Sequence, residues 1–251
     1  MIRITRPPEP PALAAVRPAR LAAAAAAVAL GQKISFDGYD RAKPALAEMQ
    51  YSKCCYCEKR EEQAKYRDVE HYRPKSPYWW LAWTWENLLF ACIDCNREHK
   101  RDQFPRAPGD VALQPHEQPP GGELPLVINP AEVDPIDEIH FVCLKHNGRE
   151  RWLPRGTSAG GRSTVAVCKL DRPGLLDLYL EHVNQQVRPR TKLVIDAARA
   201  TQPREVVANW SRATRSLLAP ARPFRALSHD ALAVLVAPAL RARYQLPLAR
   251  P

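Results

Sequence analysis

Two pairs of cysteines enclose the stretch in which most residues capable of chemistry gather: Cys54 with Cys57, and Cys92 with Cys95. Each pair leaves two residues between its cysteines, so that one tight turn directs two sulfurs to the same point. Paired turns of this kind are typical of structural zinc in a reducing compartment. We predict that these four cysteines bind Zn²⁺, with Cys55 as an alternative to Cys54. The other interpretation is that reduced cysteines fill a core as small apolar side chains.

Between the two pairs stand residues suited to hydrolysis. "VEHYRP" places Glu70 beside His71, and "ENLLFACIDCN" contains Asn87 and Asn96. An imidazole with a pKa near 6.5 is suited to accept a proton from water. Carboxylate and amide oxygens are ligands of hard cations such as Mg²⁺ and Mn²⁺. The alternative for His71 is an ordinary structural histidine.

These stretches, with "REHK" after the second cysteine pair, resemble the HNH endonucleases, whose ββα-metal fold is a two-stranded hairpin followed by one helix. The nine-residue step from Asn87 to Asn96 matches the step between the second and third signature positions of that family. The resemblance implies that His71 is the general base and that Asn87 holds the His71 loop and imidazole. It implies that Glu70 and Asn96 bind one catalytic Mg²⁺ or Mn²⁺, with His99 as an extra ligand or phosphate contact. The family more often has Asp or His at the first of these two ligands, and His at the second.

The charge of the chain favours a polyanionic partner. There are 37 Lys and Arg against 27 Asp and Glu, a net charge of +10. Nucleic acid is the commonest such partner, and we expect DNA, although a merely soluble basic protein has the same composition. We expect phosphate contacts from the basic residues beside the site, which are Arg73, Lys75, Arg97, Lys100 and Arg101.

The aromatic run "YWWLAWTW" (residues 78–85) has two interpretations. It is expected to pack the hairpin onto the rest of the domain. The functional alternative is stacking on an unpaired or distorted nucleic-acid strand.

The elements that must position these residues indicate an α+β, mostly helical protein with a zinc-stapled ββα-metal (HNH) core. We expect an N-terminal helical region (1–53), the nuclease core with its Cys₄ zinc (54–105), a linker and β hairpin (106–168), and a C-terminal helical region (169–251). "LPLVINP" predicts a short buried strand over 124–130. In the stretch 139–154, the Asn-Gly pair at 147–148 suits the type I′ turn of a hairpin.

The stretch "RLAAAAAAVAL" (residues 20–30) follows several arginines and imitates a short signal peptide. Its apolar run is about ten residues long, too short to span a bilayer. Alanine is also the strongest helix former. We therefore expect an ordinary helix in a cytoplasmic protein with no membrane segment.

Further stretches point to a narrower family. "CCYCEKR", "EHYRPKS" and "CNREHKRDQFP" are typical of HNH proteins in general, whereas "LVINPAEVDP" and "RGTSAGGRSTVAVCKLDRPGL" resemble the PtuB family. PtuB proteins are the HNH nuclease subunits of Septu anti-phage systems and of some retrons. The resemblance covers roughly residues 40–180. It implies a bacterial defence effector that acts with an ABC-type ATPase subunit of the PtuA kind, and C-terminal helices that dock a partner or pack their own core.

Three functions agree with this pattern. The first is a metal-dependent HNH endonuclease that hydrolyses phosphodiester bonds. The second is a zinc-stabilised nucleic-acid-binding module without catalysis, which would need no base beside a metal ligand. The third is a stand-alone, restriction-like HNH enzyme, which would need no ATPase partner.

Overall fold

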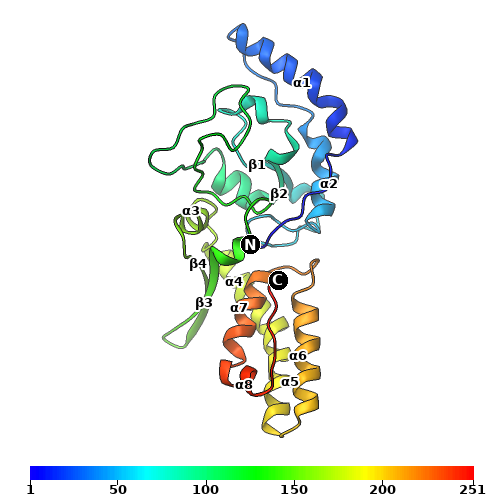
Figure 1. Ribbon diagram of the computed structural model, residues 1–251, viewed down its shortest axis with the longest axis vertical. Helices are drawn as coiled ribbons and strands as arrows, with labels where there is room; N and C mark the ends of the chain where they lie inside the picture. Colours follow the sequence, from blue (N-terminus) through cyan, green and yellow to red (C-terminus); the bar gives the residue numbers. More distant parts are fainter.

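The computed structural model describes residues 1–251, except for the side chain of His146. Figure 1 shows α1, α2, β1 and β2 in the upper part of the molecule and the helices α4 to α8 in the lower part. The hairpin β3–β4 and helix α3 lie between the two parts (Figure 1). The fold is α+β with two small antiparallel hairpins, in agreement with the predicted fold class.

The first hairpin pairs β1 (Arg67–His71) with β2 (Leu88–Cys92). Every residue of β2 is buried, because hydrophobic cores cover both of its faces. Leu89 and Ala91 join the larger core, which contains the cysteine turns, whereas Phe90 joins the second core, which contains the aromatic run. Alternation along a strand therefore sends neighbouring side chains of this hairpin into different surroundings.

The aromatic run forms much of the second core. Its large rings are all at most 8% exposed, namely Tyr78, Trp79, Trp80, Trp83 and Trp85. The buried indole N–H groups find acceptors, as when Trp83 donates to the carbonyl oxygen of Asp37 at 2.8 Å. The packing interpretation of this run is therefore confirmed.

The N-terminal helices lie against this second core. Helix α1 (Pro11–Ala29) confirms the predicted helix, and α2 (Lys43–Met49) follows a 3₁₀ turn over Tyr39–Ala42. The apolar run is longer than expected, because the helix starts at Pro11: α1 is long and apolar enough, by length and composition, to cross a membrane. Only 11% of that stretch is buried, and its buried residues are Leu13 and Ala24.

The second hairpin joins β3 (Ile139–His146) to β4 (Arg149–Gly156). The turn residues Asn147 and Gly148 have positive φ angles of 49° and 74°, as the predicted type I′ turn requires. Helix α3 (Ala159–Val167) follows and packs on β4. A Cβ atom on Gly161 would overlap the carbonyl oxygen of Glu138, so the glycines of "TSAGGR" permit close packing of α3.

The predicted strand over 124–130 is wrong. Its middle residues Val127 and Ile128 are buried as expected, but the segment makes only an isolated bridge between Arg106 and Pro125. The prolines at 125 and 130 have no N–H group for a strand ladder. The amide of Ile128 donates instead to the hydroxyl of Thr164 at 2.8 Å.

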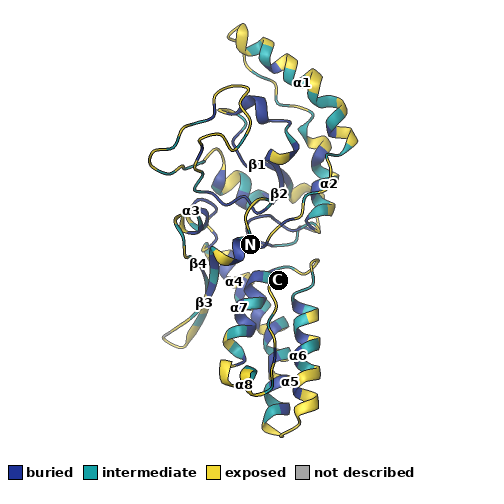
Figure 2. Cartoon of the chain, viewed as in Figure 1, coloured by how far each residue is buried: buried dark blue, intermediate teal, exposed yellow. Residues whose placement is uncertain are grey.

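The C-terminal helices form a bundle whose buried sides face inward (Figure 2). Helix α4 continues through a π-helical segment over Val183–Val187 into α5, and α5 packs along α6. The bounds are α4 (Pro173–His182), α5 (Arg188–Arg199), α6 (Pro203–Leu217), α7 (Arg225–Leu235) and α8 (Pro238–Arg243).

Polar contacts join this bundle to the first cysteine turn. Glu58, directly after that turn, accepts hydrogen bonds from the N-terminal amides of α7, at 2.8 Å from Arg225 N and 3.3 Å from Ala226 N. Lys53, directly before it, donates to the carbonyl oxygen of Pro220 at 2.7 Å. One hydrophobic core also extends from the cysteines to α7. The four domain boundaries stay predictions.

Candidate functional site

The four predicted zinc ligands come together. The sulfur atoms of Cys54, Cys57, Cys92 and Cys95 all lie within 4.8 Å of one another, and all four residues are buried. The distance between the sulfurs of Cys57 and Cys92 is 3.8 Å. In a tetrahedral site with Zn–S bonds of about 2.3 Å, the sulfurs stand about 3.8 Å apart. The cluster therefore fits a structural zinc ion, and Cys55 lies outside it.

The surroundings of the cluster suit thiolates. The amide of Cys95 donates to the sulfur of Cys92 at 3.5 Å, and the guanidinium of Arg172 donates to the sulfur of Cys95 at 3.6 Å. Burial raises the pKa of Cys54, but hydrogen bonds from the neighbouring thiols outweigh burial and hold this pKa well below the ordinary value. The hydrogen bonds with Cys54 raise the pKa of Cys57 and of Cys95 in return. Donors of this kind stabilise negative sulfur and complete the outer shell of a metal centre.

His71 ends strand β1, and its ring is held in one orientation. Its Nε2 atom lies 2.9 Å from the carbonyl oxygen of Ala82, and the ring of Tyr39 packs edge-on at 4.6 Å between ring centres. A carbonyl oxygen can only accept, so Nε2 carries the proton and Nδ1 keeps its lone pair. Burial, followed by the charge of Lys75, lowers the pKa of His71 to about 3, so the imidazole is neutral at neutral pH.

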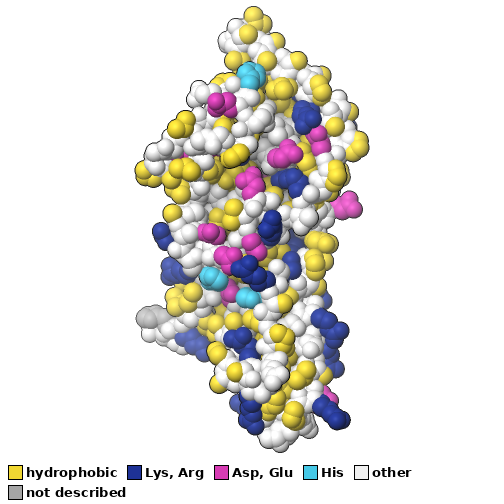
Figure 3. Space-filling view, in the orientation of Figure 1, with side chains coloured by type: hydrophobic (Ala, Val, Ile, Leu, Met, Phe, Trp, Pro, Cys, Tyr) yellow, Lys and Arg dark blue, Asp and Glu magenta, His cyan; other side chains and the backbone are white. Residues whose placement is uncertain are grey.

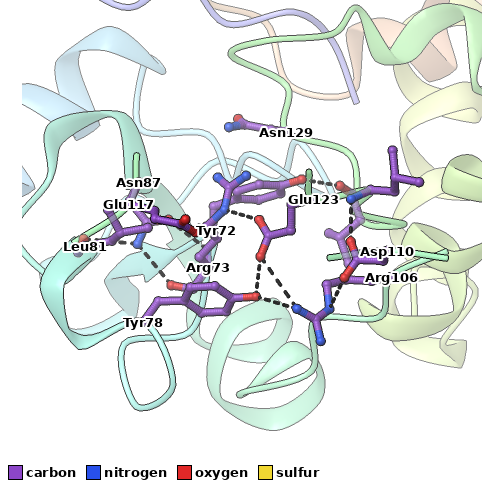
Figure 4. Close-up of polar contacts among 12 residues, drawn as sticks. Tyr72, Arg73, Tyr78, Leu81, Asn87, Arg106, Asp110, Glu117, Glu123 and Asn129 are labelled. Carbon is purple, nitrogen blue, oxygen red and sulfur yellow. Dashed lines mark hydrogen bonds and ion pairs between the residues drawn. The ribbon is translucent and has the colours of Figure 1, made fainter. Parts of the chain in front are cut away.

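Asn87 holds both ends of the loop that follows His71. Its Oδ1 atom accepts from the amide of Arg73 at 2.8 Å. Its Nδ2 atom donates to the carbonyl oxygens of Arg73 at 3.0 Å and Leu81 at 3.2 Å (Figure 4). Because Leu81 precedes Ala82, this clamp positions the carbonyl group that binds the His71 ring. Asn87 therefore lies where it can position the imidazole through the backbone.

Glu70 lies on the opposite face of β1 from His71 and is 1% exposed. Its Oε1 atom is 2.6 Å from the ammonium nitrogen of Lys100 and accepts from the hydroxyl of Tyr56 at 3.0 Å. Lys100 also donates to the carbonyl oxygen of His71 at 3.1 Å. Burial raises the pKa of Glu70, and the charge of Lys100 opposes this shift.

Asn96 lies on the π-helical segment Asp94–Lys100, where the sequence predicts the beginning of a helix after the second cysteine pair. Its Nδ2 atom donates to Asp68 Oδ2 at 3.0 Å and to the carbonyl oxygen of Val69 at 3.3 Å. The guanidinium of Arg97 binds both carboxylate oxygens of Asp68, at 2.6 and 2.8 Å. These contacts leave Asn96 Oδ1 as a free acceptor, because both hydrogen bonds of the Asn96 side chain are donated by Nδ2.

One surface cavity of about 280 Å³ connects these groups along β1. Most of the predicted site residues line it together with others that the sequence analysis did not single out. Its lining consists of Tyr39, Asp68, Val69, Glu70, His71, Pro74, Lys75, Asn96, Arg97, Arg101 and Asp102.

Besides Asn87, three predicted residues of the nuclease site do not line this cavity. Arg73 is 3% exposed, and its Nε atom binds Glu123 at 2.7 Å in the network of Figure 4. Lys100 is fully buried against Glu70, so it is not on the surface that we expected to bind phosphate. His99 lines a different cavity with Lys169, because the π-helical segment turns it away from Asn96.

Two contributors were missed by the sequence analysis. Asp68 stands two residues before Glu70, so strand periodicity places both carboxylates on one face of β1, and this signal was available. Tyr56 lies inside the first cysteine turn and carried no signal, because its contact with Glu70 joins separate segments. The sequence around His146 gives this histidine no functional role, and its side chain lies outside the part of the chain that the structure describes.

Comparison with known proteins gives two relatives. The Septu protein PtuB of Bacillus mycoides (strain KBAB4) is 36% identical over 125 residues, which are 43% of this chain and 42% of that protein. The Septu protein PtuB of Bacillus thuringiensis is 31% identical over 151 residues, 59% of this chain and 44% of that protein. The matched segment therefore spans less than half the length of these curated relatives. No protein-family model matches the chain, and no solved structure matches it significantly.

Proposed function

This chain is related to the Septu PtuB proteins, and on that premise we propose that it is a metal-dependent HNH endonuclease. In this proposal it hydrolyses phosphodiester bonds of nucleic acid, with DNA as the expected substrate. It is a cytoplasmic effector of anti-phage defence that acts with an ABC-type ATPase subunit.

The observation that carries the proposal is the fixed tautomer of His71. Its Nε2–H donates to Ala82, so Nδ1 is the acceptor that remains for a proton from water. The ring lines the same cavity as Glu70 and Asn96. A neutral, oriented imidazole beside oxygen ligands is the arrangement that general-base hydrolysis requires.

Glu70 and Asn96 would hold the catalytic Mg²⁺ or Mn²⁺, with Asp68 supplying a second carboxylate on the same strand face. Such a cation acts as a Lewis acid and stabilises charge on the leaving oxygen. Lys75, Arg97 and Arg101 line the cavity and would bind the phosphates on either side of the scissile bond. His71 takes the proton of the attacking water at Nδ1.

Cleavage of a plasmid with Mg²⁺ or Mn²⁺ tests the proposal, with the chain alone and with its co-purified ATPase. The wild-type chain is expected to nick the plasmid, and His71→Ala to lose about 10²–10⁴-fold in rate. The matched control is His229→Ala, which removes a histidine outside the cavity. Equal rates for the wild type and His71→Ala, or no nicking in either preparation, would contradict the proposal.

One observation favours the second candidate, a zinc-stabilised binding module. Lys100 and Tyr56 both bind the carboxylate of Glu70, so this carboxylate has partners without a divalent cation. Binding of Mn²⁺ followed by electron paramagnetic resonance separates the two functions. The nuclease is expected to bind one Mn²⁺ ion, with an affinity that Asn96→Ala lowers. The binding module would bind no Mn²⁺ at this site.

A further inference from the structure

We propose that the outer face of the β3–β4 hairpin is a nucleic-acid-binding ribbon that holds the duplex outside the candidate active site. The choice of nucleic acid as ligand rests on the proposed nuclease function. The argument comes from the distribution of charge, the contacts of the ribbon arginines and the anchoring of the hairpin.

The positive charge of the chain is concentrated away from the cysteine turns and the cavity. Residues 1–138 contain 18 Lys and Arg against 20 Asp and Glu, whereas residues 139–251 contain 19 against 7. The second segment thus has a net charge of +12 and the first a net charge of −2. In Figure 3 most acidic side chains lie in the upper part of this face, and basic side chains predominate in the lower part. A polyanion is therefore attracted to the C-terminal half.

Within that half, three arginines share one face of the ribbon. Arg149, Arg151 and Arg155 are exposed residues of β4, separated by even numbers of residues, so their side chains point to the same side. Val142 and Leu144 of β3 pair with residues on this same face and are 40% and 42% exposed. The three guanidinium groups form no ion pair with the described side chains. The charges are thus available to an external ligand.

Some basic residues of the bundle have acidic partners. On α6, Arg212 has Glu205 at 3.8 Å. On α5, both Lys192 and Arg199 pair with Asp196. The ribbon instead presents three arginines, unpaired among the described side chains, side by side on one face, so we place the nucleic-acid contact there.

The ribbon is held firmly from its inner face. Phe141 and Trp152 are buried, and the amide of Phe141 donates to Asp230 of α7 at 2.6 Å. The one acidic residue of β4, Glu150, points to the inner face and binds Arg188 of α5 at 2.6 Å. The acid is therefore neutralised away from the basic face. A two-stranded ribbon has dimensions that the major groove of duplex DNA admits.

Binding of a short labelled DNA duplex by full-length His71→Ala protein, followed by fluorescence anisotropy at several salt concentrations, tests this inference. Replacing Arg149, Arg151 and Arg155 with Gln removes three phosphate contacts. The slope of log K against log salt concentration should fall by about 2.7, at about 0.9 per contact. Replacing all three with Lys keeps the charge and should retain most of the slope.

The matched control replaces Arg204, Arg212 and Arg215 of α6 with Gln, which removes the same charge from exposed positions of the bundle. This variant should change the slope by less than about one unit. An unchanged slope in the ribbon variant would overturn the inference, as would an equal loss in the α6 variant. The inference would also be overturned if the ribbon variant bound DNA normally but no longer co-purified with the ATPase, because the ribbon would then bind a protein.

Failure of the proposed function gives a different result. The wild-type chain could bind the duplex through the ribbon arginines and yet cleave no nucleic acid. That result would support the proposed role of the ribbon and contradict the proposed nuclease function. Circular dichroism of each variant must match that of the parent, so that lost binding reports lost contacts.

Discussion

At the scale of single residues, backbone carbonyl groups and buried charges decide what the site can do. The carbonyl group of Ala82 selects the tautomer of His71, and Asn87 holds that carbonyl group through its neighbour Leu81. Burial raises the pKa of Glu70, and the ammonium group of Lys100, 2.6 Å away, opposes this shift. Protonation at this site is therefore determined by contacts between separate segments.

The pair formed by Lys100 and Glu70 is expected to be essential for stability. Lys100→Met leaves the Glu70 carboxylate buried without a positive partner, which typically costs about 3–5 kcal/mol. Urea unfolding at pH 7, without added Mg²⁺, should show this loss. The control is the double variant Lys100→Met with Glu70→Gln, which removes both charges and should recover most of the stability. A single variant as stable as the wild type would show that the buried pair is not needed.

At the scale of elements, the cysteine cluster joins the end of the β1–β2 hairpin to the turn that contains Cys54 and Cys57. Cys92 ends β2, Cys95 lies in the π-helical segment, and Cys54 and Cys57 come from a separate segment. The same π-helical segment brings Asn96 to Asp68 and Lys100 to Glu70. Helical segments of this type are rare and often lie at functional sites.

Removal of zinc is expected to unfold this element. A structural zinc site contributes roughly 10–16 kcal/mol of binding free energy to folding, so Cys92→Ser should lose bound zinc and melt at a much lower temperature. Zinc content measured by mass spectrometry, together with thermal melting, checks this result. Cys55→Ser is the informative control, because Cys55 lies beside the cluster but outside it, and we expect full zinc content. Loss of zinc in Cys55→Ser, with retention in Cys54→Ser, would mean that Cys55 is the ligand.

At the scale of the whole molecule, the bundle and the cysteine turns form one connected structure. Glu58 accepts from the first amides of α7, and one hydrophobic core includes both regions. His182 lies where α4 meets α7, with its Nε2 atom 2.8 Å from the hydroxyl of Ser228. Ser228 is of a residue type that often caps a helix, but α7 begins earlier, at Arg225, so Ser228 is buried within the helix.

The packing of His182 should make folding sensitive to acid. Burial lowers its pKa to about 4 in the folded chain, whereas an unfolded histidine has a pKa of about 6.5. The unfolded chain thus binds the proton first as the pH falls, so this contribution to stability is present above pH 6.5 and is lost between pH 6.5 and 4. It amounts to about 2 kcal/mol between pH 7 and pH 5.

Urea unfolding at pH 7 and pH 5 measures this effect. His182→Gln keeps an amide for the Ser228 hydroxyl and does not titrate, so its stability should depend less on pH by about 2 kcal/mol. Other titrating groups are the same in both chains and cancel in the comparison. Parallel pH dependences for the wild type and His182→Gln would exclude this histidine as the sensitive group.

Local signals in the sequence determined the cluster of four cysteines that fits zinc, the β3–β4 hairpin with its Asn-Gly turn, the buried aromatic run and the resemblance to PtuB proteins. These features depend on residues close together in the chain, where spacing constrains geometry directly. Cys-x-x-Cys turns and an Asn-Gly pair specify their own local backbone. The predicted strand over 124–130 does not form, because its prolines have no N–H group for a strand ladder and the amide of Ile128 donates to the distant hydroxyl of Thr164.

The tertiary structure alone decided which charges face the cavity and which are buried. The spacing of residues in the sequence could not show that Lys100 is buried against Glu70. Nor could it show that Arg73 pairs with Glu123, or that Asn96 donates a hydrogen bond to Asp68. It also could not show that three arginines of the β3–β4 ribbon form no ion pair with the described side chains, whereas Arg212 of the bundle has an acidic partner. The physical reason is that burial and pairing of a charge depend on side chains distant in sequence, whose positions are set by packing of the whole chain.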